Sequence, residues 1–256
     1  MKERDMADDQ RLYNSVAPLR NVAALTALIE RVNERAIGLP GMACFYGFSG
    51  FGKSTAAIYA ANRFQAVLVQ CKSAWTKKNL CAAILVELGL VPKGNTADMV
   101  DRIAAELTLR GVPLIIDEAD HLVARKMVEI VRDIYEGSQA TTILIGEELL
   151  PQKLKEWERV HGRMLDWIAA LPADMGDLNH LTGIYAPGVE LAAELKADLL
   201  RLSHGSTRRV CVNLAQVHER AQVLGVNRLG GADVDLRRLY TGTAPTPRRS
   251  EFAGAA

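Results

Sequence analysis

The stretch Gly47–Phe48–Ser49–Gly50–Phe51–Gly52–Lys53–Ser54–Thr55 decides how the rest of this chain is interpreted. Its fixed positions match the phosphate-binding loop pattern GxxxxGK[ST]. An apolar run at 42–46 precedes it and suits a buried strand, and residues 55–63 follow it and suit a helix. The backbone N–H groups of such a loop, together with the helix N-terminus, attract phosphate groups. The stretch therefore predicts a site for a nucleoside triphosphate.

The residues of the loop have separate expected roles. We expect Lys53 to reach the β- and γ-phosphates and the Ser54 hydroxyl to ligate Mg²⁺. The residues expected to contact the nucleotide are Gly47, Ser49, Gly50, Phe51, Gly52, Lys53, Ser54 and Thr55. The alternative is a glycine-rich turn that matches the pattern by accident, and the flanking strand and helix patterns argue against it.

A second apolar run, Leu114–Ile115–Ile116–Asp117–Glu118, ends in two carboxylates and has the form of a Walker B strand. Asp117 is expected at the carboxyl end of this strand, beside the phosphate loop, where it would hold Mg²⁺ through water or Ser54. Glu118 is then placed to orient and deprotonate the attacking water. The letters Asp117–Glu118–Ala119–Asp120 also suggest a helicase box, but the chain is too short for two helicase-type domains.

Composition narrows the class of protein. The 256 residues suit one medium domain, or a core with a small appendage, and 49% hydrophobic and 24% charged residues are ordinary for a soluble globular protein. No apolar run approaches the roughly 20 residues of a membrane span, and the charged N-terminus lacks the apolar segment of a secretory signal. We therefore expect a cytoplasmic location. The cysteines form no CxxC pair and are expected to be reduced core residues; they are Cys44, Cys71, Cys81 and Cys211.

Strand and helix patterns alternate in the first two thirds of the chain. The expected strands are 42–46, 66–71, 112–118, 141–146 and 165–171. The expected helices before and between these strands are 16–35, 55–63, 79–88, 96–110, 124–135 and 149–164. This alternation predicts an α/β fold with a mainly parallel five-stranded sheet covered on both faces.

The strand patterns stop at residue 172, which marks a change of architecture. Helices are expected at 174–185, 189–203, 206–224 and 233–240. The predicted organisation is a flexible N-terminal arm (1–15), an αβα nucleotide-binding core (16–171), a small all-helical C-terminal lid (172–240) and a disordered tail (241–256).

Hydrolysis also needs a cation that stabilises charge on the γ-phosphate. Arg159 and Arg163 close the helix that follows the strand at 141–146, and Arg208 and Arg209 open a helix of the lid. The alternative for each is a surface arginine that only solvates its helix.

The order of these motifs resembles that of the AAA+ ATPases over roughly residues 16–240. Within that class, the short N-terminal lead-in, the wording of the phosphate loop and the compact lid with Arg208–Arg209–Val210–Cys211–Val212–Asn213 resemble the family of the B transposition protein of phage Mu and its prophage relatives. The helper ATPases of other transposons are more distant. The resemblance implies an AAA+ P-loop core that uses ATP and Mg²⁺, in a bacterial protein encoded by a phage or prophage.

The resemblance also implies a function. ATP binding would drive assembly into helical filaments on double-stranded DNA without strong sequence preference, and the filament would deliver target DNA to a transposase. The transposase would stimulate hydrolysis, which clears the filament. The alternatives are a loader or secretion-type ATPase that acts on a protein partner, and a nucleotide-gated adaptor that hardly hydrolyses ATP. A nucleotide kinase is a weaker alternative, because the helical lid offers no evident phosphoryl-acceptor site.

Residue roles carry over from the resemblance position by position. The residues that match the nucleotide site are Lys53, Ser54, Asp117 and Glu118. Arg208 matches the lid arginine called sensor 2, with Arg209 as the alternative. Arg163, preferred over Arg159, matches the finger that reaches a neighbouring subunit's nucleotide.

Two features depart from the family pattern. The sensor 1 position, usually a neutral polar residue, falls near Glu147 or Glu148, where an acid would lower hydrolysis or mean an alignment shifted by one residue. The Mu protein carries an N-terminal helix-turn-helix domain for which this chain has no room, so DNA binding is expected from the ATPase body.

The favoured DNA-binding surface follows the second strand and consists of Lys72, Trp75, Lys77 and Lys78. Lysines there would give salt-dependent, sequence-tolerant phosphate contacts. The alternative is a solvated loop with Trp75 packed on the core. The basic surplus of the lid, including Arg237 and Arg238, is a second candidate, with a solvated helix face as its alternative.

Overall fold

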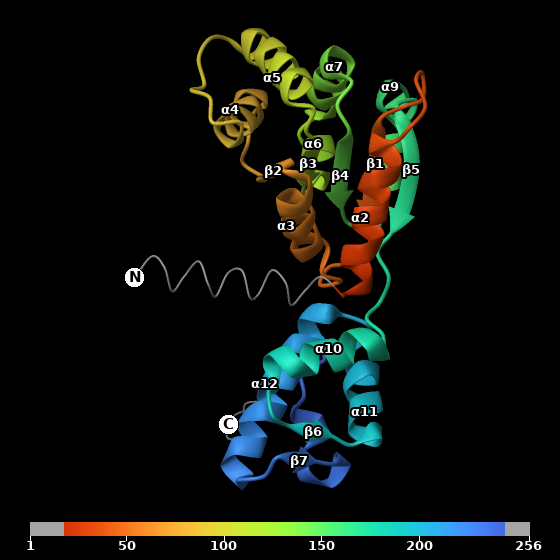
Figure 1. Ribbon diagram of the computed structural model, residues 1–256, viewed down its shortest axis with the longest axis vertical. Coiled ribbons are helices and arrows are strands. Elements are labelled where there is room, and N and C mark those ends of the chain that lie inside the picture. Colours follow the sequence, from red (N-terminus) through yellow and green to blue (C-terminus); the bar gives the residue numbers. More distant parts are fainter. Residues whose placement is uncertain (1–17, 244–256) are drawn as a thin grey trace, which may run out of the picture.

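The computed structural model describes residues 18–243 (Figure 1). An α/β part lies at the top of Figure 1 and a mostly helical part at the bottom, joined by the segment between β5 and α10. The predicted arm at 1–15 and residues 244–256 of the predicted tail lie outside the described residues.

The α/β part is built on one five-stranded sheet. Its strands are β1 (Met42–Tyr46), β2 (Val67–Gln70), β3 (Leu114–Asp117), β4 (Thr142–Gly146) and β5 (Met164–Ala169). All neighbouring pairs are parallel, and the order across the sheet is β2-β3-β4-β1-β5. The predicted parallel sheet is confirmed. Because β4 lies between β1 and β3, the end of β4 separates the phosphate loop from the two carboxylates.

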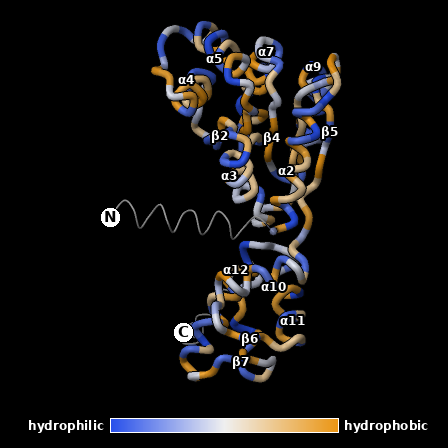
Figure 2. Tube along the Cα trace, in the orientation of Figure 1, coloured by the Kyte–Doolittle hydropathy of each residue, from blue (hydrophilic) through white to orange (hydrophobic). Residues whose placement is uncertain are grey.

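Helices cover both faces of the sheet, as its two-sided burial requires. They are α2 (Arg20–Asn33), α3 (Lys53–Phe64), α4 (Lys77–Glu87), α5 (Thr96–Arg110), α6 (Asp120–Ala124), α7 (Val128–Ser138), α8 (Leu150–Lys155) and α9 (Glu158–His161). Successive residues of β1 point to opposite faces: Ala43 and Phe45 pack with α2 and α3, while Met42 and Cys44 pack with α4 to α8. Figure 2 shows hydrophobic residues along β4, between these two layers.

Two predicted helices differ in the structure. The helix expected at 124–135 corresponds to α7, which begins only at Val128, because α6 ends at Ala124 and Lys126 adopts the left-handed backbone conformation (φ 53°) between them. The helix expected at 149–164 is replaced by the short helices α8 and α9. By contrast, α5 has the predicted bounds, because an Asn95–Asp98 capping box starts it and Gly111 ends it.

The lower part contains α10 (Met175–Tyr185), α11 (Ala193–Ser203) and α12 (Thr207–Leu224). Leucines and valines of these helices, such as Leu199 and Val217, continue the hydrophobic cluster of α2 and α3. The structure adds two short parallel strands that the sequence did not suggest, β6 (Glu190–Leu191) and β7 (Arg228–Leu229). In place of the helix expected at 233–240 it has the 3-10 turns η1 (Gly231–Asp233) and η2 (Leu236–Arg238).

The cysteines and possible membrane spans are two features for which composition gave an expectation. The four cysteines are free thiols; three are buried and Cys211 is half-buried. Within residues 18–243, none of the helices combines the length and apolar character that crossing a membrane demands.

Candidate nucleotide site

The phosphate loop connects the carboxyl end of β1 to the first residue of α3. Gly50 and Gly52 adopt positive φ angles of 85° and 82°, a conformation that side chains with a Cβ rarely adopt. Gly52 lies directly before the helix, so the free N–H groups at the start of α3 face the loop. The sequence pattern and the backbone conformation therefore both indicate a loop that can bind an anion.

Lys53 extends along the inside of this loop. Its Nζ donates hydrogen bonds to the carbonyl oxygens of Gly47 at 2.6 Å and Phe48 at 2.9 Å. Burial lowers the pKa of Lys53, and the nearby carboxylates of Asp117 and Glu118 act in the opposite direction. The two carboxylates therefore stabilise the charged ammonium form of Lys53, against the effect of burial.

The two acids that end the Walker B run occupy the opposite wall of the site. Asp117 is 5% exposed, and its Oδ1 accepts a hydrogen bond from the backbone N–H of Glu118 at 2.9 Å. Glu118 has a positive φ of 55°, which turns the chain sharply into α6. A non-glycine residue in this conformation is uncommon and occurs at functional turns.

The Glu118 carboxyl has a raised pKa. Burial is the largest cause, followed by repulsion from Asp117; His121 and Lys53 lower the value, and Glu147 adds a smaller increase. A carboxylate with a raised pKa is a stronger base, which suits the predicted role of Glu118 in deprotonating water.

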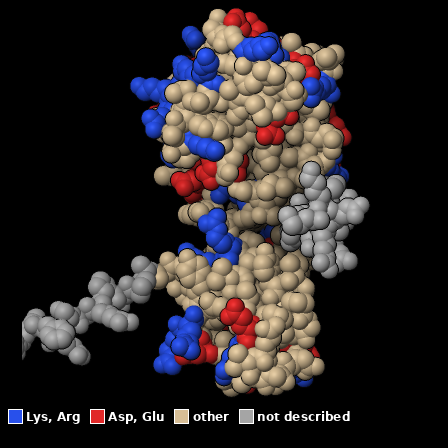
Figure 3. Space-filling model, turned by 90° about the vertical axis from the view of Figure 1, so that its left-hand side faces the viewer, with Lys and Arg blue, Asp and Glu red and all other residues tan. Residues whose placement is uncertain are grey.

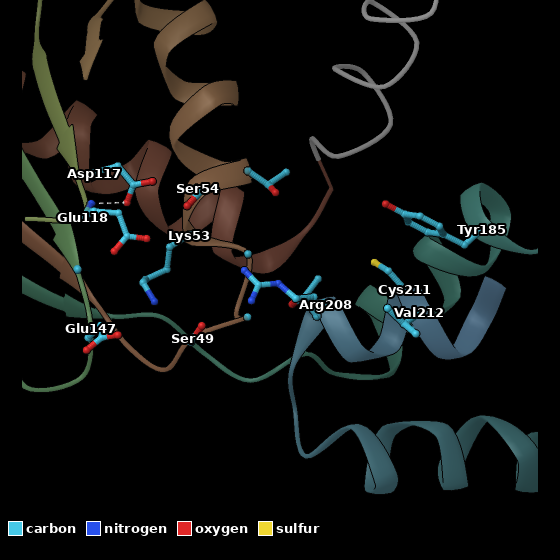
Figure 4. Close-up of a pocket in the computed structure, with 15 residues that line it drawn as sticks. Ser49, Lys53, Ser54, Asp117, Glu118, Glu147, Tyr185, Arg208, Cys211 and Val212 are labelled. Atoms are coloured by element: carbon cyan, nitrogen blue, oxygen red, sulfur yellow. Dashed lines mark hydrogen bonds between the residues drawn. The ribbon is translucent and has the colours of Figure 1, made fainter. Parts of the chain in front are cut away.

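A cavity of about 330 Å³ lies between the sheet edge and the lid. This volume is within the range of small-molecule sites. Its lining residues are Ser49, Gly50, Gly52, Lys53, Ser54, Thr55, Asp117, Glu118, Gly146, Glu147, Tyr185, Thr207, Arg208, Cys211 and Val212. Figure 4 shows the acids and Lys53 at one end, with Tyr185, Cys211 and Val212 at the other.

Comparison with known proteins adds an independent finding about the fold. Residues 37–154, which include the loop and both acids, match the family described as AAA domain. The Orc1 protein of Aeropyrum pernix, solved in complex with DNA, is similar with a TM-score of 0.59 and 18% identity, over 83% of this chain and 62% of that one. This chain has the AAA+ fold.

Two other solved structures share that fold. The Holliday junction branch migration motor RuvB of Thermotoga maritima matches with a TM-score of 0.55 and 19% identity, over 83% of this chain and 66% of its own. Cdc6p of Pyrobaculum aerophilum matches with a TM-score of 0.56 and 14% identity, over 88% of this chain and 65% of its own. This chain spans slightly less than two thirds of each of the three proteins. No match was found among curated proteins.

In this AAA+ core, Arg208 is the lid arginine that reaches the cavity. It lies in the first turn of α12, and its backbone N–H donates to the Gly50 carbonyl at 3.0 Å. Figure 4 shows its guanidinium group directed toward Lys53. Arg209, the alternative, does not line the cavity; its guanidinium group lies against Gly242. The geometry favours Arg208 as the residue that contacts a nucleotide.

The two candidate finger arginines lie away from the cavity of their own AAA+ core. The carbonyl of Arg163 accepts a hydrogen bond from the N–H of Met42, at the opposite end of β1 from the phosphate loop. The Arg163 side chain pairs with Glu136 of α7. Arg159 is exposed on α9. Neither arginine lines the cavity, so a role for either in hydrolysis requires a neighbouring subunit and stays a prediction.

Glu147 is the acid at the end of β4 that lines the cavity, and its match to the sensor 1 position stays a prediction. It follows β4 directly, between the loop and the Walker B strand, and it lines the cavity whereas Glu148 does not. Asp120 accepts a hydrogen bond from the Glu147 N–H at 2.6 Å and pairs with Lys153 at 2.7 Å. Asp120, the last residue of the helicase-like box, thus connects the turn after β3 to the turn after β4.

Four cavity residues of the lid were missing from the sequence prediction: Tyr185, Thr207, Cys211 and Val212. The Tyr185 hydroxyl and the Cys211 thiol share a hydrogen bond, and burial raises the pKa of both groups. No sequence pattern marked them as site residues, because α10 and α12 bring Tyr185 and Cys211 together only in the folded chain. Their mixed apolar and polar surface suits a nucleotide base.

The predicted DNA-binding residues lie together at the turn from β2 into α4. Lys72, Lys77 and Lys78 are exposed, and Trp75 is half-buried against the hydrophobic core. Lys72 Nζ lies 5.8 Å from the centroid of the Trp75 ring, within cation–π range. The face that contains α4 is in view in Figure 3, where basic side chains of the upper part are interspersed with acidic and uncharged ones.

The second candidate surface lies on the lid. Arg237 and Arg238 belong to the exposed turn η2, and Arg237 pairs with Asp235 at 3.0 Å. This pairing reduces the positive charge that Arg237 offers to DNA.

Proposed function

We propose that this protein is a Mg²⁺-dependent ATPase that binds double-stranded DNA, assembles on it in the ATP-bound form, and delivers target DNA to a transposase. The observation that carries the ATPase part is the single cavity that joins Lys53, Asp117, Glu118 and Arg208. The transposase, the filament and a phage or prophage origin in a bacterial cytoplasm rest on the sequence resemblance.

The residues present fit a magnesium ion. Mg²⁺ prefers oxygen ligands and is commonly bound through one or two carboxylates and the phosphates of a substrate. Ser54 and Asp117 both line the cavity and would supply the protein ligands, while no cluster of three or more His, Cys, Asp or Glu ligands occurs between residues 18 and 243. When bound, the ion would neutralise charge on the β- and γ-phosphates.

Hydrolysis would use the remaining residues of the cavity. Glu118 would take a proton from a water whose oxygen attacks the γ-phosphorus, and the bond to the β–γ bridging oxygen would break to release ADP and phosphate. Lys53 and Arg208 would stabilise the negative charge on the phosphate oxygens. Arg163 or Arg159 of a neighbouring subunit would add a further cation.

Two observations support binding to DNA. The similar Orc1 protein was solved in complex with DNA. In this chain, the Arg125 Nε donates to the Ser73 carbonyl at 2.7 Å, which adds another cation beside Lys72, Lys77 and Lys78. A cluster of this kind suits contacts to phosphates rather than to bases.

The position of Glu147 favours a second candidate function, a nucleotide-gated adaptor or loader that acts on a protein partner and hydrolyses ATP slowly. A negative charge at the phosphate end of the cavity opposes binding of the anionic γ-phosphate. Under this candidate, Glu147→Gln would raise kcat/KM at least fivefold without producing assembly on DNA.

Co-sedimentation with duplex DNA distinguishes the two candidates. The proposed function predicts that protein pellets with plain duplex DNA in MgATP and is released in MgADP, and that DNA raises the rate of phosphate release. A protein that hydrolyses ATP and never pellets with DNA at low salt would favour the adaptor or loader. Absence of nucleotide binding would contradict both.

A further inference from the structure

Asn21 is a buried polar side chain that joins three separate segments of the protein. It lies in the first turn of α2 and is 5% exposed. Its Nδ2 donates to the carbonyl of Phe51 in the phosphate loop and to the carbonyl of Leu171, both at 2.8 Å. Its Oδ1 accepts a hydrogen bond from the N–H of Leu171, also at 2.8 Å. Both N–H donors of the amide and its carbonyl oxygen are therefore hydrogen-bonded.

The position of Leu171 gives these bonds their significance. Leu171 lies in the segment between β5 and α10, which connects the core to the lid (Figure 1). This segment, residues 170–174, is called the hinge below, because a rotation of the lid about it would move the backbone to which Asn21 is bound. Phe51, the other partner, belongs to the loop expected to hold the phosphates, so one side chain joins the hinge to the loop.

The lid itself contacts the same loop directly, at the residue that precedes Phe51. The Gly50 carbonyl accepts hydrogen bonds from the Arg208 N–H at 3.0 Å and from the Ser206 hydroxyl at 3.4 Å. Successive carbonyls of the loop, at Gly50 and Phe51, are thus held by the lid and by Asn21. The start of α2, the loop, and the lid helices α10 and α12 also border one small cavity.

We propose that Asn21 is a positioning residue that couples the phosphate loop to the hinge, so that nucleotide affinity depends on the orientation of the lid. This inference rests on the proposed nucleotide site. A closed lid holds the loop in the conformation that binds phosphate, and a bound nucleotide in turn favours the closed lid, because coupling between two sites is reciprocal.

The decisive variant is Asn21→Asp, which keeps the shape of the side chain. It replaces the amide donor by a carboxylate that faces two carbonyl oxygens, so the bond to the loop becomes a repulsion. The matched control is Arg20→Gln. Arg20 donates to the Pro172 carbonyl at 3.1 Å and pairs with Asp174 at 3.3 Å, so it contacts the hinge and the lid without touching the loop.

The experiment measures the Kd for MgATP, the unfolding temperature, and the MgATP-induced change in distance between fluorophores on α5 and α11. We expect Asn21→Asp to raise the Kd at least tenfold and to abolish the distance change at saturating MgATP. We expect Arg20→Gln to lower the unfolding temperature while the Kd stays within twofold. Asn21→Ser, which keeps a small hydroxyl donor, supplies the same comparison if Asn21→Asp fails to fold.

The outcomes separate this inference from the function on which it rests. Equal increases in Kd for the Asn21 variants and Arg20→Gln, or a normal distance change in the Asn21 variants, would overturn the inference alone. A wild-type protein that does not bind MgATP would overturn the proposed function together with the inference.

Discussion

The Oδ2 atom of Asp120 accepts a hydrogen bond from the backbone N–H of Glu147 at 2.6 Å. This bond connects the turn that follows Glu118 to the end of β4, and so links the two chain segments that carry Glu118 and Glu147 to the cavity. Gly146 permits the approach, because a Cβ at that position would meet the Asp120 carboxylate. In the order β3-β4-β1, β4 lies between the two halves of the site, so this bond joins neighbouring strand ends.

Removing the Asp120 side chain is expected to destabilise the core. Asp120→Ala breaks a charge-assisted hydrogen bond to Glu147 and leaves Lys153 without its ion-pair partner, so we expect the free energy of unfolding to fall by about 2 kcal/mol. Lys153→Met removes only the partly exposed ion pair and should cost less than about 1 kcal/mol. Urea denaturation measures both. Equal losses would show that the bond to Glu147 contributes nothing beyond the ion pair.

Glu118→Gln is expected to separate hydrolysis from nucleotide binding. Loss of the base should lower kcat at least a hundredfold, while the Kd for MgATP stays within a few-fold. In the wild type, kcat should fall with acid at a midpoint above the usual pKa of a glutamate, because the folded protein raises this pKa. A steady-state pH profile and a binding titration measure these effects.

The same variant should also change stability in a pH-dependent way. A carboxyl whose pKa is raised on folding costs stability at pH values above its folded pKa, and the cost disappears below its unfolded value. Glu118→Gln should therefore be more stable than wild type at pH 7, with the difference vanishing near pH 4. A difference that grows as the pH falls would contradict the assigned sign.

The finger arginine can be identified by mixing inactive subunits. If Arg163 serves a neighbouring site, Arg163→Ala should lose hydrolysis and keep nucleotide binding. An equimolar mixture with Lys53→Ala should then recover measurable activity, because some interfaces combine an intact loop with an intact arginine. Arg159→Ala is the matched control and should retain activity. Recovery in the Arg159 mixture only would reverse the assignment.

The lysines that follow β2 should control the salt dependence of DNA binding. Lys77→Ala with Lys78→Ala should weaken binding uniformly across sequences and reduce the slope of log K against log[salt] by about 1 to 2, if each lysine neutralises one phosphate. Arg237→Ala with Arg238→Ala is the control of equal charge on the lid. A larger loss in the lid variant would place the DNA surface there.

The sequence predicted those parts of the protein whose signals are local. Residues 114–116 form a continuous apolar run within the buried strand β3, and the capping residues of α5, Asn95 and Gly111, directly flank the helix in the sequence. The phosphate loop was predictable for the same reason, because consecutive residues form the entire loop.

Features that no local sequence pattern marks, and features that depend on contacts between distant segments, were not predictable. The break between α6 and α7 depends on a left-handed Lys126, which no pattern marks. The strands β6 and β7 have two residues each, too few for any periodicity. Tyr185 and Cys211 meet at the cavity only because the lid folds back over the loop, and Asn21 gains its partners 30 and 150 residues away.

Electron microscopy of the protein with plain duplex DNA is the most direct test of whether the nucleotide bound at Lys53, and its hydrolysis by Glu118, control assembly on DNA. We expect ordered filaments or rings on DNA in ATP, their loss in ADP, their persistence with Glu118→Gln after ATP is added, and none with Lys53→Ala. Absence of any assembly on DNA at low salt by a wild-type protein that binds ATP would contradict this expectation.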